Sequence, residues 1–473
     1  MSDIETSNWS ETAASNNAAP PNGMPEGMAP SGVNDAGREI MGAVKREWDR
    51  SHPTVTSGGS ANAQTLSYGV NPAALVQGQV YSFIAGFTNT GPASLQVGSL
   101  AAKNVFMDNV ALTGGEIQAG AVVTVCFDGA QYQIVSSRAL TATVVKNWLI
   151  NGDMEVWQRG AGGSASIAVA ASTTAYTADR WYIFTGSNQA FTISQQTGLT
   201  NGSRFCMRVQ RNNGQTGTGQ VVIGQPLDSD FVAGLRGKIV TISAKLRSGA
   251  NWSPTSGAIS MALYVGTGSP AKRGGGFTSE TTVASVATNL GTSSSIMTAP
   301  ATASSAVPTN AGQGELQFAF TPSGTASTND WVEIDDVMIC IAPLTTVFDR
   351  RRFDEEMTAC QRFYQKSFDY AVAPAQNAGT THNYVFRENT GASVSDFNDM
   401  TPYPGGPMRV TPTITTYNPA APNAQVIDVS AGADCSGTTV AGGEKLWQLN
   451  WTNAASGAVG HILRAHASFE AEI

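Results

Sequence analysis

Residues 331–340 read WVEIDDVMIC, and in the first half of this run large apolar residues alternate with acidic ones. An alternation of period two is typical of a β-strand with one buried face and one exposed face. A second distinctive run, LINGDMEVW, lies earlier in the chain at residues 149–157. Further strand candidates between the two runs are residues 239–246, 258–265 and 315–320. Short strands throughout such a region predict a β-sandwich over residues 149–343.

The composition of the whole chain also favours strands. Among its 473 residues, 41% are hydrophobic, only 13% are charged, and 50 are glycine. Helical domains depend on Leu, Glu and Lys, which are scarce here, whereas small polar residues suit short strands joined by tight turns. A chain of this length exceeds one compact core. We therefore predict a mainly β chain of several domains.

The formal net charge of -8 argues against nucleic acid as a partner, since phosphate binding requires a basic face. The N-terminal residues lack a secretion signal, and no stretch approaches the run of about 18 apolar residues that is inserted into a membrane. The five cysteines are odd in number and widely spaced, which fits neither a disulfide framework nor a metal site. We predict buried free thiols and synthesis in a reducing cytoplasm.

Residues 1–58 are predicted to form an arm with one short helix. Residues 1–31 are rich in Ser, Asn, Ala and Pro and have too few large apolar groups to fold alone. Asn34 or Asp35 can cap the helix, and His52 with the following proline ends it. Its apolar stripe is Val33, Ile40, Val44 and Trp48. A helix this short is marginal by itself, so copies around a three-fold axis would stabilise it.

The remaining segments differ in pattern. Residues 59–138 alternate short apolar runs with Gly and Asn or Asp turns, which predicts a small β-domain with a hairpin near its end. Residues 139–148 are interpreted as a linker. Residues 344–370 predict a second, connecting helix, and their basic cluster at 350–352 is expected to be a solvated or subunit-bridging face. Residues 371–473 return to strands and are the predicted tip.

Several segments together resemble bacteriophage tail-fibre and receptor-binding proteins. The motifs that carry the resemblance are NDAGREIM at 34–41, LINGDMEVWQRG at 149–160, YTADRW at 176–181, IDDV at 334–337, CQRFYQKS at 360–367 and PMRVTPTI at 407–414. The second, third and fourth are similar to those of a carbohydrate-binding-module-like jelly roll. The resemblance implies an elongated chain of jelly-roll and sandwich domains with two short helices, a homotrimer, attachment to the virion through the arm, and binding to the host surface.

The resemblance also implies a metal site in the jelly roll. Such modules often hold a structural Ca²⁺ between their first and last strands, where Glu155 and Asp336 lie in this chain. The cation would join the two ends of the domain. The alternative interpretation is that Asp335 and Asp336 are the polar face of an edge strand. No cofactor is otherwise required.

Sugar binding would need exposed aromatic rings, which stack on apolar sugar faces, and a few amide or carboxylate groups. The ligand-binding candidates are Trp157 and Trp181, with Tyr182 and Trp252, in the central domain and Tyr403, Trp447 and Trp451, with Tyr417, in the C-terminal region. Trp157 and Trp181 lie in apolar runs, where such rings are more often core residues. Trp447 and Trp451 share one strand face and are either a core pair or a surface platform.

The sequence contains no recognisable catalytic motif. The four histidines accompany no Gly-x-Ser-x-Gly elbow, His-Glu-x-x-His pair or phosphate loop. His461 and His466 are five positions apart and share no strand face. Asp396, Asp399 and Glu388 form no recognisable pair of the kind that glycan cleavage requires. We therefore expect no enzyme.

We expect a structural subunit of a bacteriophage tail fibre, located in the virion. The arm would bind other tail proteins, and the β-domains would bind a polysaccharide or protein receptor on the host. A trimer would present three weak sites at once and gain avidity. Two alternatives stay open: a virion connector or head fibre without a receptor, and a glycan-degrading tail spike with a carboxylate-lined groove.

Overall fold

The computed structural model describes residues 4, 9–20, 22–112, 114–136, 146–160, 166–186, 189–292, 294–341 and 347–473. Within these ranges the chain is mainly β, as predicted, with 30 strands and three α-helices. No helix among the described residues is long and apolar enough to cross a membrane. The chain divides into two compact units, Met1–Thr143 and Val144–Ile473. Most of the predicted linker lies outside the described residues.

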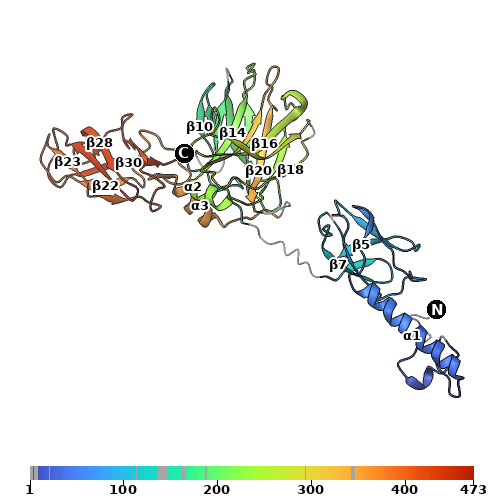
Figure 1. The fold of residues 1–473 in the computed structure, drawn as a ribbon. Coiled ribbons are helices and arrows are strands. Elements are labelled where there is room, and N and C mark those ends of the chain that lie inside the picture. The colour runs from blue at the N-terminus through green and yellow to red at the C-terminus, as the bar shows by residue number, and fades with distance from the viewer. Residues whose placement is uncertain are drawn as a thin grey trace. The chain divides into compact units, whose positions relative to one another are not determined.

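The first unit begins with helix α1, Pro30–Ser51, drawn in blue in Figure 1. Its start differs from the prediction, because Pro30 occupies the first helical position, where a missing N–H costs nothing and the fixed φ suits a helix. Asn34 and Asp35 therefore lie inside the helix rather than capping it. The predicted end at His52 is confirmed. Its apolar stripe is exposed in this chain: Val33 46%, Ile40 41%, Val44 56% and Trp48 54%.

A β-sheet follows the helix in the first unit. Its strands pair in the order β1-β2-β4-β5-β8-β7-β3, with β6 beside β5. The strands are β1 Gly58–Ser60, β2 Ala63–Leu66, β3 Val80–Ile84, β4 Ala93–Val97, β5 Lys103–Met107, β6 Val110–Ala111, β7 Val122–Phe127 and β8 Tyr132–Ile134. The predicted hairpin is confirmed, since β7 pairs antiparallel with β8. The Asp128 carboxylate stabilises its turn by accepting hydrogen bonds from the backbone N–H groups of Ala130 and Gln131.

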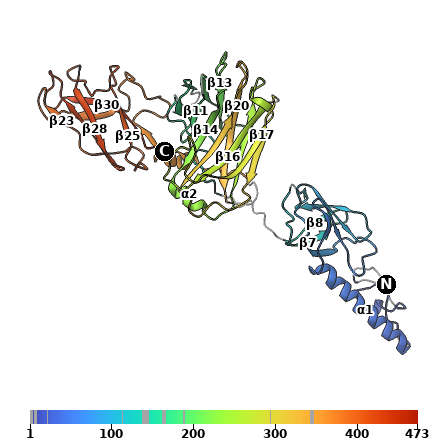
Figure 2. The ribbon, with the colours of Figure 1, turned by 45° about the horizontal axis from the view of Figure 1, so that its top comes forward.

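The second unit opens with the predicted sandwich, a jelly roll of two antiparallel six-stranded sheets (Figure 2). We call β10-β11-β14-β19-β16-β17 the first sheet and β18-β15-β20-β13-β12-β9 the second. The elements are β9 Ser166–Val169, β10 Thr174–Tyr176, β11 Tyr182–Thr185, β12 Phe191–Thr197, β13 Phe205–Arg211, β14 Val221–Leu227, α2 Ser229–Leu235, β15 Thr241–Ser248, β16 Ala258–Gly266, β17 Thr281–Asn289, β18 Met297–Thr302, β19 Gln313–Phe320 and β20 Trp331–Cys340.

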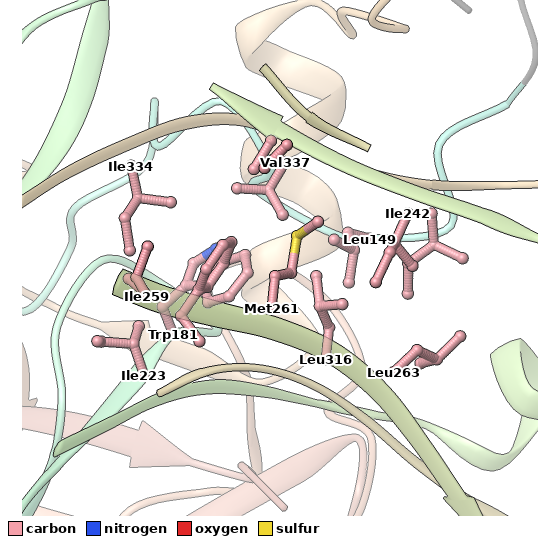
Figure 3. Close-up of a cluster of buried hydrophobic side chains, with 14 of the residues drawn as sticks. Leu149, Trp181, Ile223, Ile242, Ile259, Met261, Leu263, Leu316, Ile334 and Val337 are labelled. Atoms are coloured by element: carbon pink, nitrogen blue, oxygen red, sulfur yellow. The ribbon is translucent and has the colours of Figure 1, made fainter. Parts of the chain in front are cut away.

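The core of the jelly roll lies between the two sheets. Ile223, Met261 and Leu316 come from the first sheet, and Ile242 and Ile334 face them from the second (Figure 3). Each is buried to 1% exposure or less. Burying a side chain of this size contributes about 1.5–3 kcal/mol, so this layer dominates the stability of the domain.

Strand β20 was predicted to have one face exposed to solvent, but the structure buries both faces. It lies inside the second sheet between β13 and β15, and both Glu333 and Asp335 are fully buried. The Glu333 carboxylate accepts hydrogen bonds from Arg208 and Arg247 on the two neighbouring strands. Long arginine side chains thus cover the acidic face that the alternation assigned to solvent.

The C-terminal region belongs to the same compact unit. Its elements are α3 Phe353–Gln361, β21 Tyr364–Lys366, β22 Tyr384–Arg387, β23 Ser395–Phe397, β24 Thr401–Pro402, β25 Thr413–Tyr417, β26 Ile427–Asp428, β27 Ala433–Asp434, β28 Ser436–Gly442, β29 Leu446–Thr452 and β30 Ile462–Glu470. Strand β30 pairs with β21, β22, β25 and β26, and β29 pairs with β23, β24 and β28. The predicted connecting helix is therefore present but shorter.

The basic cluster before α3 was predicted to be a solvated or subunit-bridging face; Arg352 is exposed, whereas Arg350 and Arg351 form contacts within the unit. Arg350 forms ion pairs with Asp153 at 3.2 Å and Asp336 at 2.6 Å. Arg351 donates to the Leu149 carbonyl oxygen and pairs with Glu356. These contacts tie the segment before α3 to the two ends of the jelly roll.

All five cysteines are free, as predicted. Cys206, Cys340, Cys360 and Cys435 are buried, and Cys126 is half-buried. Burial raises the pKa of the Cys360 thiol well above its usual value. A thiol held in its neutral form is a poor nucleophile, so Cys360 acts as a small apolar core residue.

Candidate functional site

The five predicted ligand-binding rings are all core residues. The exposed fraction is 0% for Trp157, Trp181 and Trp447, 2% for Trp451 and 3% for Tyr403. A buried ring has no free face on which a sugar can stack. The prediction that these rings bind ligand is therefore wrong, and the alternative interpretation as core residues applies to each of them.

Trp157 and Trp181 share one end of the jelly-roll core. The indole N–H of Trp157 donates to the Met154 carbonyl oxygen at 2.6 Å, and that of Trp181 donates to the Asn151 carbonyl oxygen at 2.9 Å. A Cβ atom on Gly152 would lie 2.2 Å from the Val337 carbonyl oxygen, so only glycine fits there. The LINGDMEVW segment thus closes one end of the sandwich core, and this role explains its distinctive sequence.

Tyr403, Trp447 and Trp451 belong to the core of the C-terminal region. Strand β29 points Trp447 and Trp451 inward, and the ring centroids of Trp447 and Phe469 are 5.0 Å apart. The Tyr403 ring also packs against Phe469, at 4.9 Å, and its hydroxyl donates to the Gly443 carbonyl oxygen. The pair that the strand pattern left undecided is a core pair.

Glu155 and Asp336 have arginine partners. The Asp336 carboxylate accepts a hydrogen bond from Arg350 at 2.6 Å, and Glu155 pairs with Arg204 at 3.4 Å. Neither residue belongs to a cluster of three metal-ligating side chains among the described residues. Residues 149–157, predicted to be the opening strand, form no strand and precede β9. Because Arg350 already supplies a positive charge between Asp153 of this segment and Asp336 of the last strand, Ca²⁺ would have to displace it. The calcium assignment stays a prediction.

Polar and aromatic side chains do gather on the outer face of the first sheet. Strand β19 turns Leu316 and Phe318 inward, so Glu315 and Gln317 point to the opposite side. Cross-strand pairing places Tyr264 of β16 beside Glu315. Tyr182 of β11 is opposite Gly224 of β14, which is in turn opposite Gln317. We call Tyr182, Tyr264, Glu315 and Gln317 the aromatic–polar face.

The members of the aromatic–polar face are joined by hydrogen bonds. The Tyr182 hydroxyl donates to Glu315 Oε1 at 2.6 Å, and Gln317 Nε2 donates to the same oxygen at 2.7 Å. A Cβ atom on Gly224 would lie 2.3 Å from Glu315 Oε1. The missing side chain at Gly224 therefore makes room for the contact between Tyr182 and Glu315.

The loop between β16 and β17, residues 267–280, covers this face. The Arg273 backbone N–H donates to Glu315 Oε2 at 2.7 Å, and its guanidinium lies 3.8 Å from the centre of the Tyr264 ring. Glu280 accepts two further bonds from the same guanidinium, the shorter at 2.7 Å. Lys272 Nζ lies 4.6 Å from the centre of the Tyr176 ring. The loop thus supplies two cations to a surface of carboxylate, amide and phenol groups.

Burial governs the charges at this site. It raises the pKa of Glu315, although hydrogen bonds from Tyr182, Arg273 and Gln317 act in the opposite direction. Burial lowers the pKa of Lys272, and nearby Glu472 partly offsets that effect. The site therefore combines fixed hydrogen-bond donors and acceptors with aromatic rings. A polyhydroxylated ligand binds through groups of these kinds.

The sequence contained a signal for part of this face. Gln313, Glu315 and Gln317 alternate with apolar residues, and an alternating strand indicates two chemically different faces. Tyr182 was already a candidate aromatic residue. The position of Arg273 had no signal, because a loop carries no periodicity from which its path can be predicted.

One further cluster lies in the C-terminal region. Glu388, Asp428 and His461 each direct one ligand atom to a common point, and these atoms lie within 4.8 Å of one another. Sequence reasoning missed the cluster, since it considered His461 only with His466 and found no partner for Glu388. Among the described residues this is the one group of three side chains with metal-ligating geometry.

No family model matches the chain, and no curated protein sequence matches it. Solved structures match part of it. The carbohydrate-binding module TmCBM61, in complex with β-1,4-galactotriose, is 11% identical with a TM-score of 0.23, over 42% of this chain and 99% of that one. The xylan-binding domain of carbohydrate-binding module family 22 is 12% identical with a TM-score of 0.23, over 35% and 89%.

The chain is equally similar to a solved structure of an enzyme, so such matches do not specify a function. The Stig cyclase Fisc from Fischerella sp. TAU is 12% identical with a TM-score of 0.25, over 39% of this chain and 100% of that one. Carbohydrate-binding modules and a cyclase are thus similar to the same chain at the same level. Similarity this low says nothing about the ligand of this chain.

Proposed function

We propose that the chain is the receptor-binding subunit of a bacteriophage tail fibre and that it binds a host-surface glycan through the aromatic–polar face of its jelly roll. The observation that carries the glycan assignment is the network in which Tyr182, Gln317 and Arg273 converge on Glu315. The virion assignment is supported by the resemblance of the arm and the jelly-roll motifs to tail-fibre proteins.

The network suits a sugar for geometric reasons. A carboxylate and an amide two positions apart on the same face of one strand place hydrogen-bond acceptors and donors side by side, as the hydroxyl groups of a sugar require. The Tyr264 ring beside them is half-buried and can contact an apolar sugar face. A ligand at this face would exchange hydrogen bonds with groups that the fold already holds in place, so little side-chain entropy is lost on binding.

Access to the network requires the 267–280 loop to move. Glu315 is fully buried, and Gln317 is 4% exposed. Gly274 and Gly276 in the loop have φ values of +47° and +116°, which favour glycine and allow large backbone changes. A cavity of about 230 Å³ at the base of the loop is lined by Thr267 and Ser279, among others. This space would accept part of the loop or the end of a saccharide.

The exposed stripe of α1 supports assembly. Val44 and Trp48 expose more than half of their surface in the isolated chain, and Met41 exposes 74%. A second and third copy of the same helix would cover these residues, as in a coiled coil. The homotrimer, anchored to other tail proteins by the arm, would then present three glycan sites, and weak single-site binding would gain avidity.

The test is binding of the purified full-length chain to polysaccharide from the surface of the host that the virus infects. Gln317→Ala and Tyr264→Ala should each weaken binding about tenfold or more, because each removes a group that contacts the ligand. The matched control is Gln196→Ala, which removes an amide side chain from the second sheet. This variant should bind the polysaccharide like the wild type.

Three outcomes would overturn the proposal. Unchanged binding by both face variants would place the glycan elsewhere. A chain that binds no surface polysaccharide of its host would leave the connector or head-fibre alternative. Release of reducing sugar from the polysaccharide would instead identify a glycan-degrading tail spike.

A further inference from the structure

Three segments distant in sequence meet at one end of strand β30. Glu388 directly follows β22, Asp428 is the last residue of β26, and His461 directly precedes β30. Both β22 and β26 pair with β30, with Arg387 opposite Ile462 and Asp428 opposite Leu463. Strand pairing alone therefore brings the three side chains to the same place.

The three side chains point toward one another. His461 Nδ1 lies 2.7 Å from Asp428 Oδ2 and 4.0 Å from Glu388 Oε2. The other Asp428 oxygen accepts the backbone N–H groups of Ser430 and Ala431, both at 2.9 Å. Two hydrogen bonds thus fix the orientation of Asp428 and direct Oδ2 into the cluster.

Glu388 is the unusual member. It is 1% exposed, and both of its carboxylate oxygens are buried without a hydrogen-bond partner among the described residues. A buried carboxylate without a partner is costly, so its retention in the fold calls for a ligand.

Charge balance at the cluster points to a cation. Asp428 is fully buried, and among the described residues neither it nor Glu388 forms an ion pair with a lysine or arginine. Several other buried acidic residues of this unit differ, since Asp336, Glu333 and Glu472 have arginine partners. Among the described residues, Asp335 and Asp396 have no such partner, but each accepts hydrogen bonds from backbone N–H groups. Among the described residues, the Glu388 carboxylate has neither an arginine partner nor a hydrogen-bond donor, so a cation between Glu388 and Asp428 would supply the missing countercharge.

We propose that Glu388, Asp428 and His461 bind a divalent transition-metal ion, with Zn²⁺ as its representative. One imidazole nitrogen and two carboxylate oxygens are hard and borderline ligands that suit Zn²⁺ and its neighbours better than the all-oxygen shell of Ca²⁺. The His461 side chain is 27% exposed, which leaves an approach for the ion and for a water as a further ligand. The ion would link three loops at this end of the C-terminal region.

The experiment is calorimetric titration of the chelator-treated full-length chain with ZnCl₂, with the melting temperature recorded in parallel. The wild type should bind one ion per chain and melt at a higher temperature with Zn²⁺, because an ion that binds only the folded state stabilises it. The affinity of Glu388→Gln for Zn²⁺ should be lower than that of the wild type by a factor of about ten or more. The same should hold for His461→Ala.

Two controls make the result specific. His382→Ala removes an exposed histidine that pairs with Asp369, outside the cluster, and should bind Zn²⁺ like the wild type. Glu155→Gln should also retain binding, which separates this site from the predicted calcium site. Glu388→Gln replaces an unpaired buried charge with a neutral group of the same shape, so loss of folding is not expected from it.

Absence of Zn²⁺ binding by the folded wild type would overturn the proposal, and so would undiminished binding by folded Glu388→Gln. If a variant does not fold, Co²⁺ bound to the wild type provides a second measurement. Its visible absorption should show histidine and carboxylate ligation at one site, and a spectrum of Co²⁺ in water alone would contradict the assignment.

Discussion

Arg180 of the jelly roll and Glu472 near the C-terminal end form an ion pair in which the two side chains are only 2% and 4% exposed. Arg180 also donates to the Pro226 carbonyl oxygen at 2.7 Å and lies 3.5 Å from the centre of the Phe363 ring. Arg159 adds a second ion pair to Glu472, at 3.1 Å. The end of the chain is thus bound to the jelly roll through buried charges.

Glu472→Gln should destabilise the second unit by about 3–5 kcal/mol, because it leaves the buried Arg180 guanidinium without its counter-charge, while Arg159 keeps its ion pair with Asp179. The measurement is urea unfolding of the full-length chain, followed by tryptophan fluorescence. Glu444→Gln is the matched control, since Glu444 is exposed, and it should unfold like the wild type. Equal stability of the two variants would contradict the role of the pair.

Gly224→Ala should damage the aromatic–polar face. The new Cβ atom would lie 2.3 Å from Glu315 Oε1 and 2.7 Å from Tyr182 Cε1, so the hydrogen bond between these residues must break or shift. We expect a loss of about 1–3 kcal/mol in the free energy of unfolding and weaker glycan binding. Gly275→Ala in the covering loop has open space around its Cβ atom and should show neither effect.

Stability should fall as the pH rises through the range where Asp153 titrates. Burial raises the pKa of Asp153 to about 6, Glu356 adds to the rise, and Arg350 opposes it. Because the folded chain binds this proton more tightly than the unfolded chain, the group contributes stability at low pH that is lost between about pH 4 and 6. Asp153→Asn should flatten this part of the profile, measured by urea unfolding in EDTA. An unchanged slope would assign the effect to other carboxylates.

The predicted calcium site can be tested by removing the Arg350 guanidinium, which occupies the place of the ion. The predicted ligands are Glu155 and Asp336. Arg350→Gln leaves Asp336, and Asp153 beside it, without their guanidinium partner, so Ca²⁺ should raise the melting temperature of this variant more than that of the wild type. A rise in the wild type that Asp336→Asn abolishes would establish the site in the native chain. If Ca²⁺ leaves Arg350→Gln unchanged, these carboxylates do not bind the ion.

The trimer that we propose should depend on the exposed stripe of α1. Val44→Glu introduces a charge into a surface that three helices would share, and it should convert the trimer to monomers. Light scattering of the full-length chain gives the mass directly. Ser31→Glu adds the same charge to an exposed polar position of the same helix and should leave the trimer intact. A monomeric wild type, or a trimeric Val44→Glu, would contradict this role of the helix.

Local patterns in the sequence determined which segments form strands and helices. The hairpin of β7 and β8, the end of α1 at His52 and the sandwich between residues 149 and 343 followed from periodicity, turn residues and composition. These features depend on neighbours within a few positions, so they can be predicted without knowledge of the fold. The start of α1 was missed because Pro30 replaced the expected side-chain cap.

Only the tertiary structure decided which side chains are exposed. The sequence favoured a core position for Trp157 and left Trp447 undecided between surface and core, and packing of the sheets buries both. Strand β20 alternates like an edge strand, yet it lies inside the second sheet because Arg208 and Arg247 cover its acidic face. Neither arginine is near β20 in sequence, so no local pattern contains this information.

Sites built from distant residues were decided by the tertiary structure for the same reason. Glu388, Asp428 and His461 converge because their strands meet on β30. Glu315 and Arg273 meet because a loop folds back over the first sheet. The β-rich character of the chain and its amphipathic helix could be predicted from local sequence, since both depend on short-range order. Strand pairing and loop path, which are long-range, determined where charge and polar groups gather.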